Sequence, residues 1–272
     1  MLINGQPSHL ISALDRGLQY GDGLFETLAV INGKPALLDR HLERLVAGCQ
    51  ALGMVQPDIN QLREESRAEA AQTSRAVLKI ILTRGEGGRG YNPASTMTPT
   101  RIIHTTPWPD YPDDHARVGV AVRLCDTRLG WNARLAGLKH LNRLEQVLAR
   151  AEWSDPGINE GVVLDGADNV IEGTMSNLFL VKSGQLITPL LDQCGVKGIM
   201  RQVVIETARD LAIKAEEQQV RVDDLKAADG LFLTNSLIGI WPVRVFDGVE
   251  YPVNLIDQTL LRTVISKGFA TV

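Results

Sequence analysis

Long apolar runs are absent from this sequence of 272 residues. No stretch approaches the roughly 18 apolar residues that a membrane-spanning helix needs. Residues 1–7 (MLINGQP) also lack the basic segment and following apolar run that mark a secretory signal. We therefore expect neither a membrane-spanning segment nor a secretion signal.

Cysteine and histidine are scarce as well. The three cysteines, Cys49, Cys125 and Cys194, are odd in number and far apart, a pattern typical of reduced cytoplasmic thiols rather than of a disulfide framework. The five histidines show no spacing typical of metal ligands. The sequence therefore predicts a cytoplasmic location and no bound metal.

The chain also lacks a block of basic residues and a cluster of aromatic ones. Its formal net charge is −4, and only 5% of its residues are aromatic. Nucleic-acid surfaces are basic and often provide aromatic rings on which bases stack, so we expect no nucleic-acid partner. The hydrophobic fraction of 44% and the length fit a globular chain with one large domain or two modest ones.

Prolines and aspartates concentrate in residues 107–114 (PWPDYPDD), which disfavours a packed element there. We therefore predict a small N-terminal domain at residues 1–107, a linker at 108–117 and a larger C-terminal domain at 118–272. Both domains mix helices and strands, so the expected class is α+β, with a cofactor site in a cleft between the domains. The predicted strands are 25–31, 76–83, 101–106, 118–124, 177–182, 214–220, 230–234 and 240–246, with a hairpin at 161–171; the predicted helices are 37–52, 61–72, 141–153, 199–213 and 256–267.

One lysine and one glutamate have the chemistry of a pyridoxal phosphate site. A lysine can form a Schiff base with the aldehyde of this cofactor, which acts as an electron sink only if an acid keeps its ring nitrogen protonated. Lys139 lies where a predicted helix begins, and Glu172 follows an alternating run typical of a strand. Each has an ordinary alternative, a solvated surface lysine and a turn carboxylate. The interpretation depends on their occurring together.

A glycine-bearing loop and an arginine are candidates for binding the cofactor's phosphate. Residues 194–201 (CGVKGIMR) lead into a predicted helix, whose first amides lack intrahelical partners and carry the positive end of the helix dipole. Arg44, in residues 41–45 (HLERL), has a guanidinium that matches phosphate oxygens. The alternative for the loop is an ordinary turn before a helix.

Together these motifs resemble the fold-type IV pyridoxal phosphate enzymes, a family that includes branched-chain and D-amino acid aminotransferases and aminodeoxychorismate lyases. The resemblance covers nearly the whole chain. Within the family, residues 84–91 (RGEGGRGY) and 139–144 (KHLNRL) look most like those of the lyases. The resembling segments are 20–27 (YGDGLFET), 41–45, Lys139, 172–179 (EGTMSNLF), 195–201 and 234–242 (TNSLIGIWP).

The resemblance implies a fold and a set of cofactor-binding residues. The fold is that of two α/β domains, as in D-amino acid aminotransferases, with pyridoxal phosphate between them. Lys139 is then the residue that holds the Schiff base, and Glu172 faces the pyridine nitrogen. The residues implied to surround the phosphate are Arg44, Val196, Gly198, Ile199 and Asn235 or Ser236.

The implied substrate is a dicarboxylate, aminodeoxychorismate, which needs cationic partners. Arg84 and Arg89 lie with Tyr91 in a glycine-rich loop, and these three residues are our substrate-binding candidates together with Phe25. A surface hairpin is the alternative for this loop. Asn142 also has two interpretations, a hydrogen bond near the cofactor or a helix N-cap.

Three functions are compatible with these motifs. The first is a carbon–oxygen lyase that converts aminodeoxychorismate to 4-aminobenzoate and pyruvate in folate biosynthesis, and the second is a branched-chain or D-amino acid aminotransferase. Fold and cofactor do not separate these two, but the residues around Lys139 and at 84–91 favour the lyase. The third is a cofactor carrier or a cofactor-free binding module, against which Glu172 argues.

The resemblance also implies a homodimer. From the residues alone the support is modest, because apolar side chains beside polar loops can be buried equally well in a monomer. The candidates for such contacts are Leu18, Tyr20, Leu24 and Trp108.

Overall fold

The structure is a computed structural model, which describes residues 1–93, 97–112 and 114–271. The chain divides into two compact units. Unit 1 comprises Met1–Pro109, Leu138–Asn142 and Phe269–Val272, and unit 2 comprises Asp110–Gly137 and Arg143–Gly268. The predicted linker contains the boundary after Pro109 and the start of a helix, α4 (His115–Val118), while its residue Asp113 lies outside the described residues.

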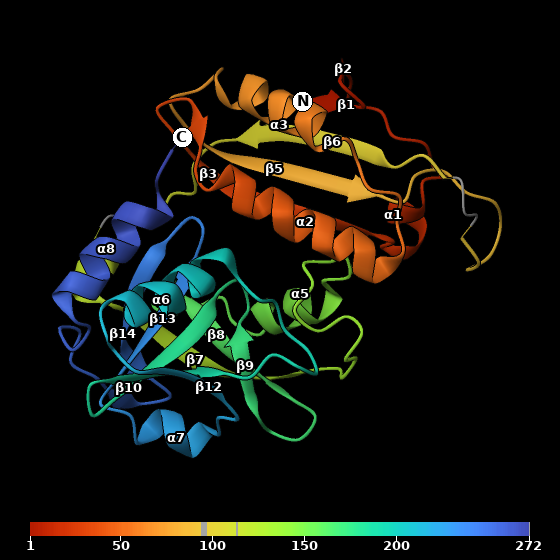
Figure 1. Ribbon diagram of the computed structural model, residues 1–272. Coiled ribbons are helices and arrows are strands. Elements are labelled where there is room, and N and C mark those ends of the chain that lie inside the picture. Colours follow the sequence, from red (N-terminus) through yellow and green to blue (C-terminus); the bar gives the residue numbers. More distant parts are fainter. Residues whose placement is uncertain (94–96, 113, 272) are drawn as a thin grey trace. The chain divides into compact units, whose positions relative to one another are not determined.

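Unit 1 is built on an antiparallel sheet with the strand order β2-β1-β6-β5-β3-β4. Helices α2 and α3 pack against it (Figure 1). Helix α2 ends at Gly53, whose left-handed backbone lets its N–H reach two carbonyls of the last turn. The elements of unit 1 are β1 (Leu2–Ile3), β2 (Gln6–Pro7), α1 (Arg16–Tyr20), β3 (Gly23–Ile31), β4 (Lys34–Pro35), α2 (Leu38–Leu52), α3 (Ile59–Ala70), β5 (Arg75–Thr83) and β6 (Thr100–Thr106).

The two faces of this sheet differ because side chains alternate along each strand. On one face Leu28 pairs with Leu78, and Ile80 with Ile103; all four are fully buried in a core that the apolar stripes of α2 and α3 complete. The opposite face, which we call the outer face, carries two rows that cross β3, β5 and β6. These rows are Phe25–Ile81–Ile102 and Thr27–Lys79–His104, and all six residues are partly exposed.

Unit 2 contains a mixed sheet with the order β12-β11-β10-β13-β14-β7-β8-β9, and β15 also pairs with β14. Strand β7 pairs in parallel with β8 and β14, and β11 with β12. The antiparallel pair of β8 and β9 confirms the predicted hairpin. The remaining elements are β7 (Val120–Leu129), α5 (Leu144–Arg150), β8 (Glu160–Asp165), β9 (Val170–Gly173), β10 (Asn177–Lys182), β11 (Gln185–Pro189), α6 (Ile199–Asp210), β12 (Ala215–Gln218), α7 (Val222–Lys226), β13 (Gly230–Asn235), β14 (Gly239–Phe246), β15 (Val249–Glu250) and α8 (Gln258–Gly268).

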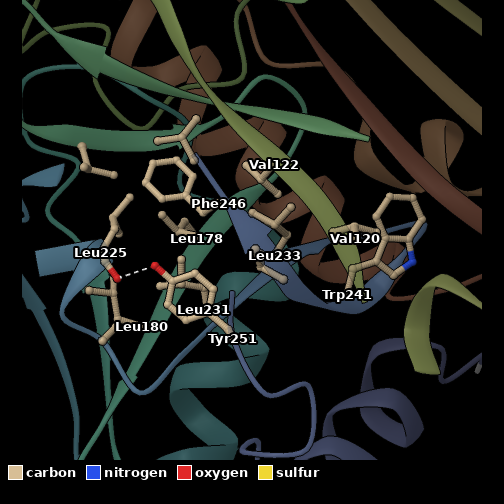
Figure 2. Packing of buried hydrophobic residues seen from close by; sticks show 14 of the residues in the cluster. Val120, Val122, Leu178, Leu180, Leu225, Leu231, Leu233, Trp241, Phe246 and Tyr251 are labelled. Atoms are coloured by element: carbon tan, nitrogen blue, oxygen red, sulfur yellow. Dashed lines mark hydrogen bonds between the residues drawn. The ribbon is translucent and has the colours of Figure 1, made fainter. Parts of the chain in front are cut away.

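The core of unit 2 is apolar, and the hydroxyl of Tyr251, which lies within it, is hydrogen-bonded. Figure 2 shows Tyr251 beside Leu180, Leu225 and Leu231, with its hydroxyl donating to the carbonyl of Leu225 at 2.9 Å. Burying a hydroxyl without a hydrogen-bond partner destabilises the fold. The bond to Leu225 removes this penalty and allows the Tyr251 ring to be buried. Burial also raises the pKa of Tyr251.

The predicted α+β class is confirmed, and most predicted elements occur within a few residues of their expected bounds. The helix predicted at residues 141–153 is wrong at both ends, because α5 spans only Leu144–Arg150. Residues 138–142 are extended and pair with β3 instead. Asn142 is accordingly not the N-cap of α5; its side-chain amide donates to the carbonyl of Gly21 at 3.1 Å. Six short elements of the described chain, α1, α4, α7, β4, β11 and β15, were not predicted.

The difference between the two sheet faces of unit 1 can be tested at neighbouring isoleucines. Ile80→Ala removes a fully buried side chain from the core face, so we expect a loss of about 2–5 kcal/mol in the free energy of unfolding. Ile81→Ala, on the partly exposed outer face, is the matched control and should lose clearly less. Urea unfolding measures both variants, and equal losses would contradict the assignment of faces.

Candidate active site

Lys139 belongs to unit 1, where a five-residue extended segment adds to the start of β3. The N–H of Phe25 donates to the carbonyl of Lys139, and the N–H of Leu141 donates to the carbonyl of Gly23, both at 2.9 Å. The ammonium nitrogen of Lys139 lies 4.4 Å from the centre of the Phe25 ring. This distance allows a cation–π contact, so two of the predicted site residues are brought together.

A buried ionic cluster lies on the core face beside this segment. The carboxylate of Glu26 is 2.6 Å from Nδ1 of His41 and receives a 2.8 Å hydrogen bond from Nε of Arg44, with a second bond from Nη2 of the same arginine. Glu26 and His41 are both 1% exposed at their side chains. Arg44, our predicted phosphate ligand, therefore has its guanidinium oriented by a carboxylate that sequence reasoning missed, although Glu26 lies inside the YGDGLFET segment.

The charges in this cluster oppose the effect of burial. Burial works against ionisation of Glu26, but the charge of Arg44 and the hydrogen bond from His41 outweigh it and lower its pKa to about 2. Burial lowers the pKa of His41, and the charges of Arg44 and Lys139 act in the same direction against the effect of Glu26.

Arg84, a predicted substrate ligand, is occupied within unit 1. Its Nε donates to Asp22 at 2.8 Å, and its two terminal nitrogens donate to the carbonyls of Leu52 and Gly53 at 2.9 Å. These carbonyls lie at the C-terminal end of α2, where a cation is favourable. The geometry thus favours a helix-capping role, and substrate binding by Arg84 stays an untested prediction.

Arg89 and Tyr91, by contrast, lie at the surface of the same loop. Arg89 is exposed and has no hydrogen-bond or ion-pair partner among the residues that the structure describes. Tyr91 is 83% exposed, and the centre of its ring lies 5.4 Å from that of Tyr20 in an edge-to-face arrangement. The guanidinium of Arg16 fixes the loop by donating to the carbonyls of Gly90 and Tyr91 at 2.9 and 3.0 Å. This loop can therefore present a cation and a phenol to an anion.

Glu172 lies in unit 2, one residue before the end of β9, as predicted. It is buried at 4% exposure and accepts a 2.8 Å hydrogen bond from the N–H of Val196. Asn177 donates more weakly to the same carboxylate at 3.5 Å and to the carbonyl of Val196 at 2.9 Å. Glu172 is thus a fixed acceptor against the predicted phosphate loop, and Asn177 is a second residue that sequence reasoning had quoted without assigning a role.

In the loop before α6, some backbone N–H groups donate hydrogen bonds within the chain and others do not. The N–H groups of Val196 and Gly198 donate to Glu172 and Asn177. Those of Ile199 and Met200 have no hydrogen-bond partner in the described part of the chain and begin α6, where the dipole is positive. A Cβ at Gly198 would lie 2.1 Å from Oδ1 of Asn177, so only glycine fits there. The amides that are open to an anion are therefore those at the start of α6.

Asn235 and Ser236 were alternative phosphate ligands, and the structure shows which groups the Asn235 side chain contacts within the chain. The side chain of Asn235 donates to the carbonyl of Met175 at 3.1 Å and accepts from the N–H groups of Leu237 and Ile238 at 2.8 and 3.0 Å. Its amide therefore holds two turns together. Ser236 follows directly and is partly exposed, and a contact of its hydroxyl with the phosphate stays a prediction.

A third buried carboxylate, Glu160, shapes the turn that follows Glu172. It is 1% exposed and accepts hydrogen bonds from backbone or side-chain groups of Gly161, Thr174, Met175 and Ser176. Burial raises its pKa, and these bonds oppose that effect. Sequence reasoning missed Glu160, although an acid at the start of an apolar alternating run is itself a sign of a buried, hydrogen-bonded carboxylate.

Two findings concern other ligands and the membrane. Over residues 1–93, 97–112 and 114–271, no group of three or more His, Cys, Asp or Glu side chains has an arrangement that could hold a metal ion. Within the same ranges, no helix has both the length and the apolar character needed to cross a membrane.

Comparison with known proteins identifies the family. The amino-transferase class IV family matches residues 23–246, and the chain belongs to this family, whose enzymes use pyridoxal phosphate. This confirms the resemblance and the fold class that it implied.

Individual relatives are similar over nearly the full length. The chain is 36% identical over 255 residues to an aminodeoxychorismate lyase from Vibrio harveyi, covering 94% of this chain and 93% of that one. It is 35% identical over 246 residues to a putative branched-chain-amino-acid aminotransferase from Methanocaldococcus jannaschii, covering 88% and 83%. The crystal structure of 4-amino-4-deoxychorismate lyase from Pseudomonas aeruginosa matches with a TM-score of 0.92 and 48% identity, covering 98% and 97%.

The ionic cluster at Glu26 makes a prediction about pH. The pKa of Glu26 falls from 4.5 to about 2 on folding, so this group stabilises the fold above pH 4.5, and its contribution is lost as the pH falls toward 2. Glu26→Gln should destabilise the protein by about 3–5 kcal/mol at neutral pH, because Arg44 and His41 lose their partner. In urea unfolding the gap between wild type and variant should narrow below pH 4.5. A gap that is constant over this range would contradict the assignment.

Proposed function

We propose that this chain is a pyridoxal phosphate-dependent 4-amino-4-deoxychorismate lyase, which converts its substrate to 4-aminobenzoate and pyruvate in folate biosynthesis. The observation that carries this proposal is the 48% identity to the lyase from Pseudomonas aeruginosa over nearly all of both chains. The segments at 84–91 and 139–144, which resemble those of lyases, add to it.

The residues of the chain fit the cofactor that the family uses. When bound, pyridoxal phosphate supplies an electron sink for the carbon that carries the substrate amine. Lys139 is our candidate for the covalent link, and the buried carboxylate of Glu172 for holding a proton on the pyridine nitrogen by charge attraction. Gly137, two residues before Lys139, is hydrogen-bonded to the carbonyl of Gly195 in the loop that also contacts Glu172.

The phosphate is assigned to a cationic side chain and a helix start. The unpartnered amides of Ile199 and Met200 suit an anion, and the guanidinium of Arg44 and the hydroxyl of Ser236 are the proposed side-chain ligands. Val196 and Gly198 contribute by fixing the loop, because their own amides are engaged. Asn235 contributes through the turns that it joins.

Lys139 is also the proposed proton carrier. Its neutral amine removes the proton from the ring carbon that bears the substrate amine, and the carbon–oxygen bond to the enolpyruvyl group then breaks. The resulting ammonium delivers a proton to the methylene carbon of the departing group, which becomes pyruvate. The formation of an aromatic ring favours the step. Arg89, Tyr91 and Phe25 are proposed to contact the substrate, and Arg84 to support them indirectly.

The lyase proposal can be tested directly against an aminotransferase activity. That alternative is supported by the likeness to the relative from Methanocaldococcus jannaschii. Coupled detection should show pyruvate released from aminodeoxychorismate without a ketoacid acceptor. Lys139→Ala should abolish this release while the fold is retained, because one group provides both the link and the proton transfer. Turnover that requires 2-oxoglutarate, or near-wild-type activity of the variant, would falsify the proposal.

The role of Glu172 predicts a different phenotype. Glu172→Gln keeps a hydrogen-bond acceptor but removes the charge that holds a proton on the pyridine nitrogen. We expect retained cofactor binding, measured by absorbance, with a loss in kcat of ~100-fold or more. Glu216→Gln, at an exposed carboxylate of β12, is the control and should leave kcat unchanged. An unchanged kcat in the Glu172 variant would assign the role to another acid.

We also propose that the protein is a cytoplasmic homodimer. Its three cysteines are buried free thiols, which suits a reducing compartment. Helix α5 exposes Leu144, Val147 and Leu148 at 77%, 60% and 61% on one face, and such a patch is typical of a protein interface. One candidate contact was wrong, since Leu24 is 2% exposed within the core of unit 1.

The α5 patch gives the dimer a test. Sedimentation at micromolar concentration should show two chains for the wild type and one chain for the double variant Leu144→Glu, Leu148→Glu, because the charges cannot be buried unpaired. Leu10→Glu, at another exposed leucine with 83% exposure, is the control and should leave the dimer intact. A fully active wild-type species of one chain mass would refute the dimer and leave the chemistry at Lys139 unaffected.

A further inference from the structure

A second lysine, Lys79, lies beside the same phenylalanine as Lys139. On the outer face of unit 1, Lys79 pairs with Thr27 on one side and His104 on the other, which places the three side chains in one row. The ammonium nitrogen of Lys79 is 5.2 Å from the centre of the Phe25 ring, and that of Lys139 is 4.4 Å from it. The two ammonium groups are therefore no further apart than the sum of these distances.

Lys79 forms no ion pair with an acidic side chain in the described part of the chain, and its ammonium lies near the Phe25 ring. The titratable side chain beside Lys79 is His104, whose pKa is lowered by burial and by the charge of Lys79. Glu69, which acts on His104 in the opposite direction, is itself paired with the amino group of Met1 at 3.0 Å. A partly buried lysine without a counter-ion provides a site for an anion from outside the chain.

The other cations considered for the substrate are placed differently. Arg84 is occupied by Asp22 and the end of α2, and Arg89 lies on an exposed loop. Lys79 instead stands on a central strand and shares an aromatic neighbour with the lysine that reacts with the substrate amine. A position on a regular strand also orients a binding group more rigidly than a loop does.

We propose that Lys79 binds the ring carboxylate of the substrate, the one that is retained in 4-aminobenzoate; this inference rests on the proposed function. That carboxylate lies across a six-membered ring from the amine, about 6 Å away by ordinary bond lengths. A charge-assisted hydrogen bond adds about 2.8 Å, so a substrate whose amine is at Lys139 can reach the Lys79 ammonium beside the same ring. Thr27 and His104 flank the carboxylate as further hydrogen-bonding groups.

The test compares two ligands of the holoenzyme that differ only in charge at this position. Wild type should bind 4-aminobenzoate more tightly than 4-aminobenzamide, measured by inhibition and by the change in cofactor absorbance. Lys79→Met should reduce this preference roughly 10- to 100-fold, the range for a hydrogen bond to a charged group. The KM for the substrate should rise more than kcat falls, and Lys79→Arg should recover much of the preference.

Lys34→Met, at an exposed lysine of β4, is the matched control and should keep the wild-type preference. An unchanged preference in Lys79→Met overturns the proposal, as does a variant that weakens inhibition by pyruvate alone, which would assign Lys79 to the other carboxylate. If Lys79→Met does not fold, Lys79→Gln is judged by the same two criteria. Absence of pyruvate release by wild type would instead refute the lyase function, which the ligand-binding comparison does not measure.

Discussion

The backbone pairing between residues 138–142 and the start of β3 is the constraint on which the position of Lys139 depends. Two main-chain hydrogen bonds of 2.9 Å join the segment to Phe25 and Gly23. Because the segment is extended, neighbouring side chains point to opposite sides, and this brings the Lys139 ammonium over the Phe25 ring. The flanking residues on both sides of the segment belong to unit 2. Lys139, the proposed catalytic lysine, is thus held by the sheet of unit 1 rather than by the helix that follows it in the chain.

Three buried carboxylates, Glu26, Glu160 and Glu172, are each stabilised in a different way. Glu26 is stabilised by charge, since Arg44 and His41 hold it ionised despite complete burial. Glu160 is stabilised by hydrogen bonds from a tight turn, which only partly offset the effect of burial on its pKa. Glu172 accepts hydrogen bonds from the backbone amide of Val196 and from the side chain of Asn177. A buried carboxylate needs such partners, so the same residues that stabilise the charge also determine the shape of the adjacent loops.

The basic residues of unit 1 carry the same charge but have different roles, because each contacts different acceptors. Arg84 ends a helix, Arg44 pairs with a buried acid, and Arg16 holds a loop through two carbonyls. These guanidinium groups stabilise the chain itself. Lys79 and Arg89 have no such partner among the described residues, and a cation of that kind is suited to an anionic ligand. The distinction could not be drawn from residue type, because it depends on which acceptors each side chain reaches.

The sequence by itself determined the family, the α+β class and most helices and strands, because apolar periodicity and turn residues are local properties. It also placed Glu172 near the end of a strand. Only the tertiary structure decided that residues 138–142 leave the helical pattern, since an apolar spacing that suits a helix is also satisfied by pairing with β3. In the sequence, Glu26 lies 113 residues and Lys79 60 residues before Lys139. Their relation to that lysine exists only through strand pairing and helix packing, which no local pattern encodes.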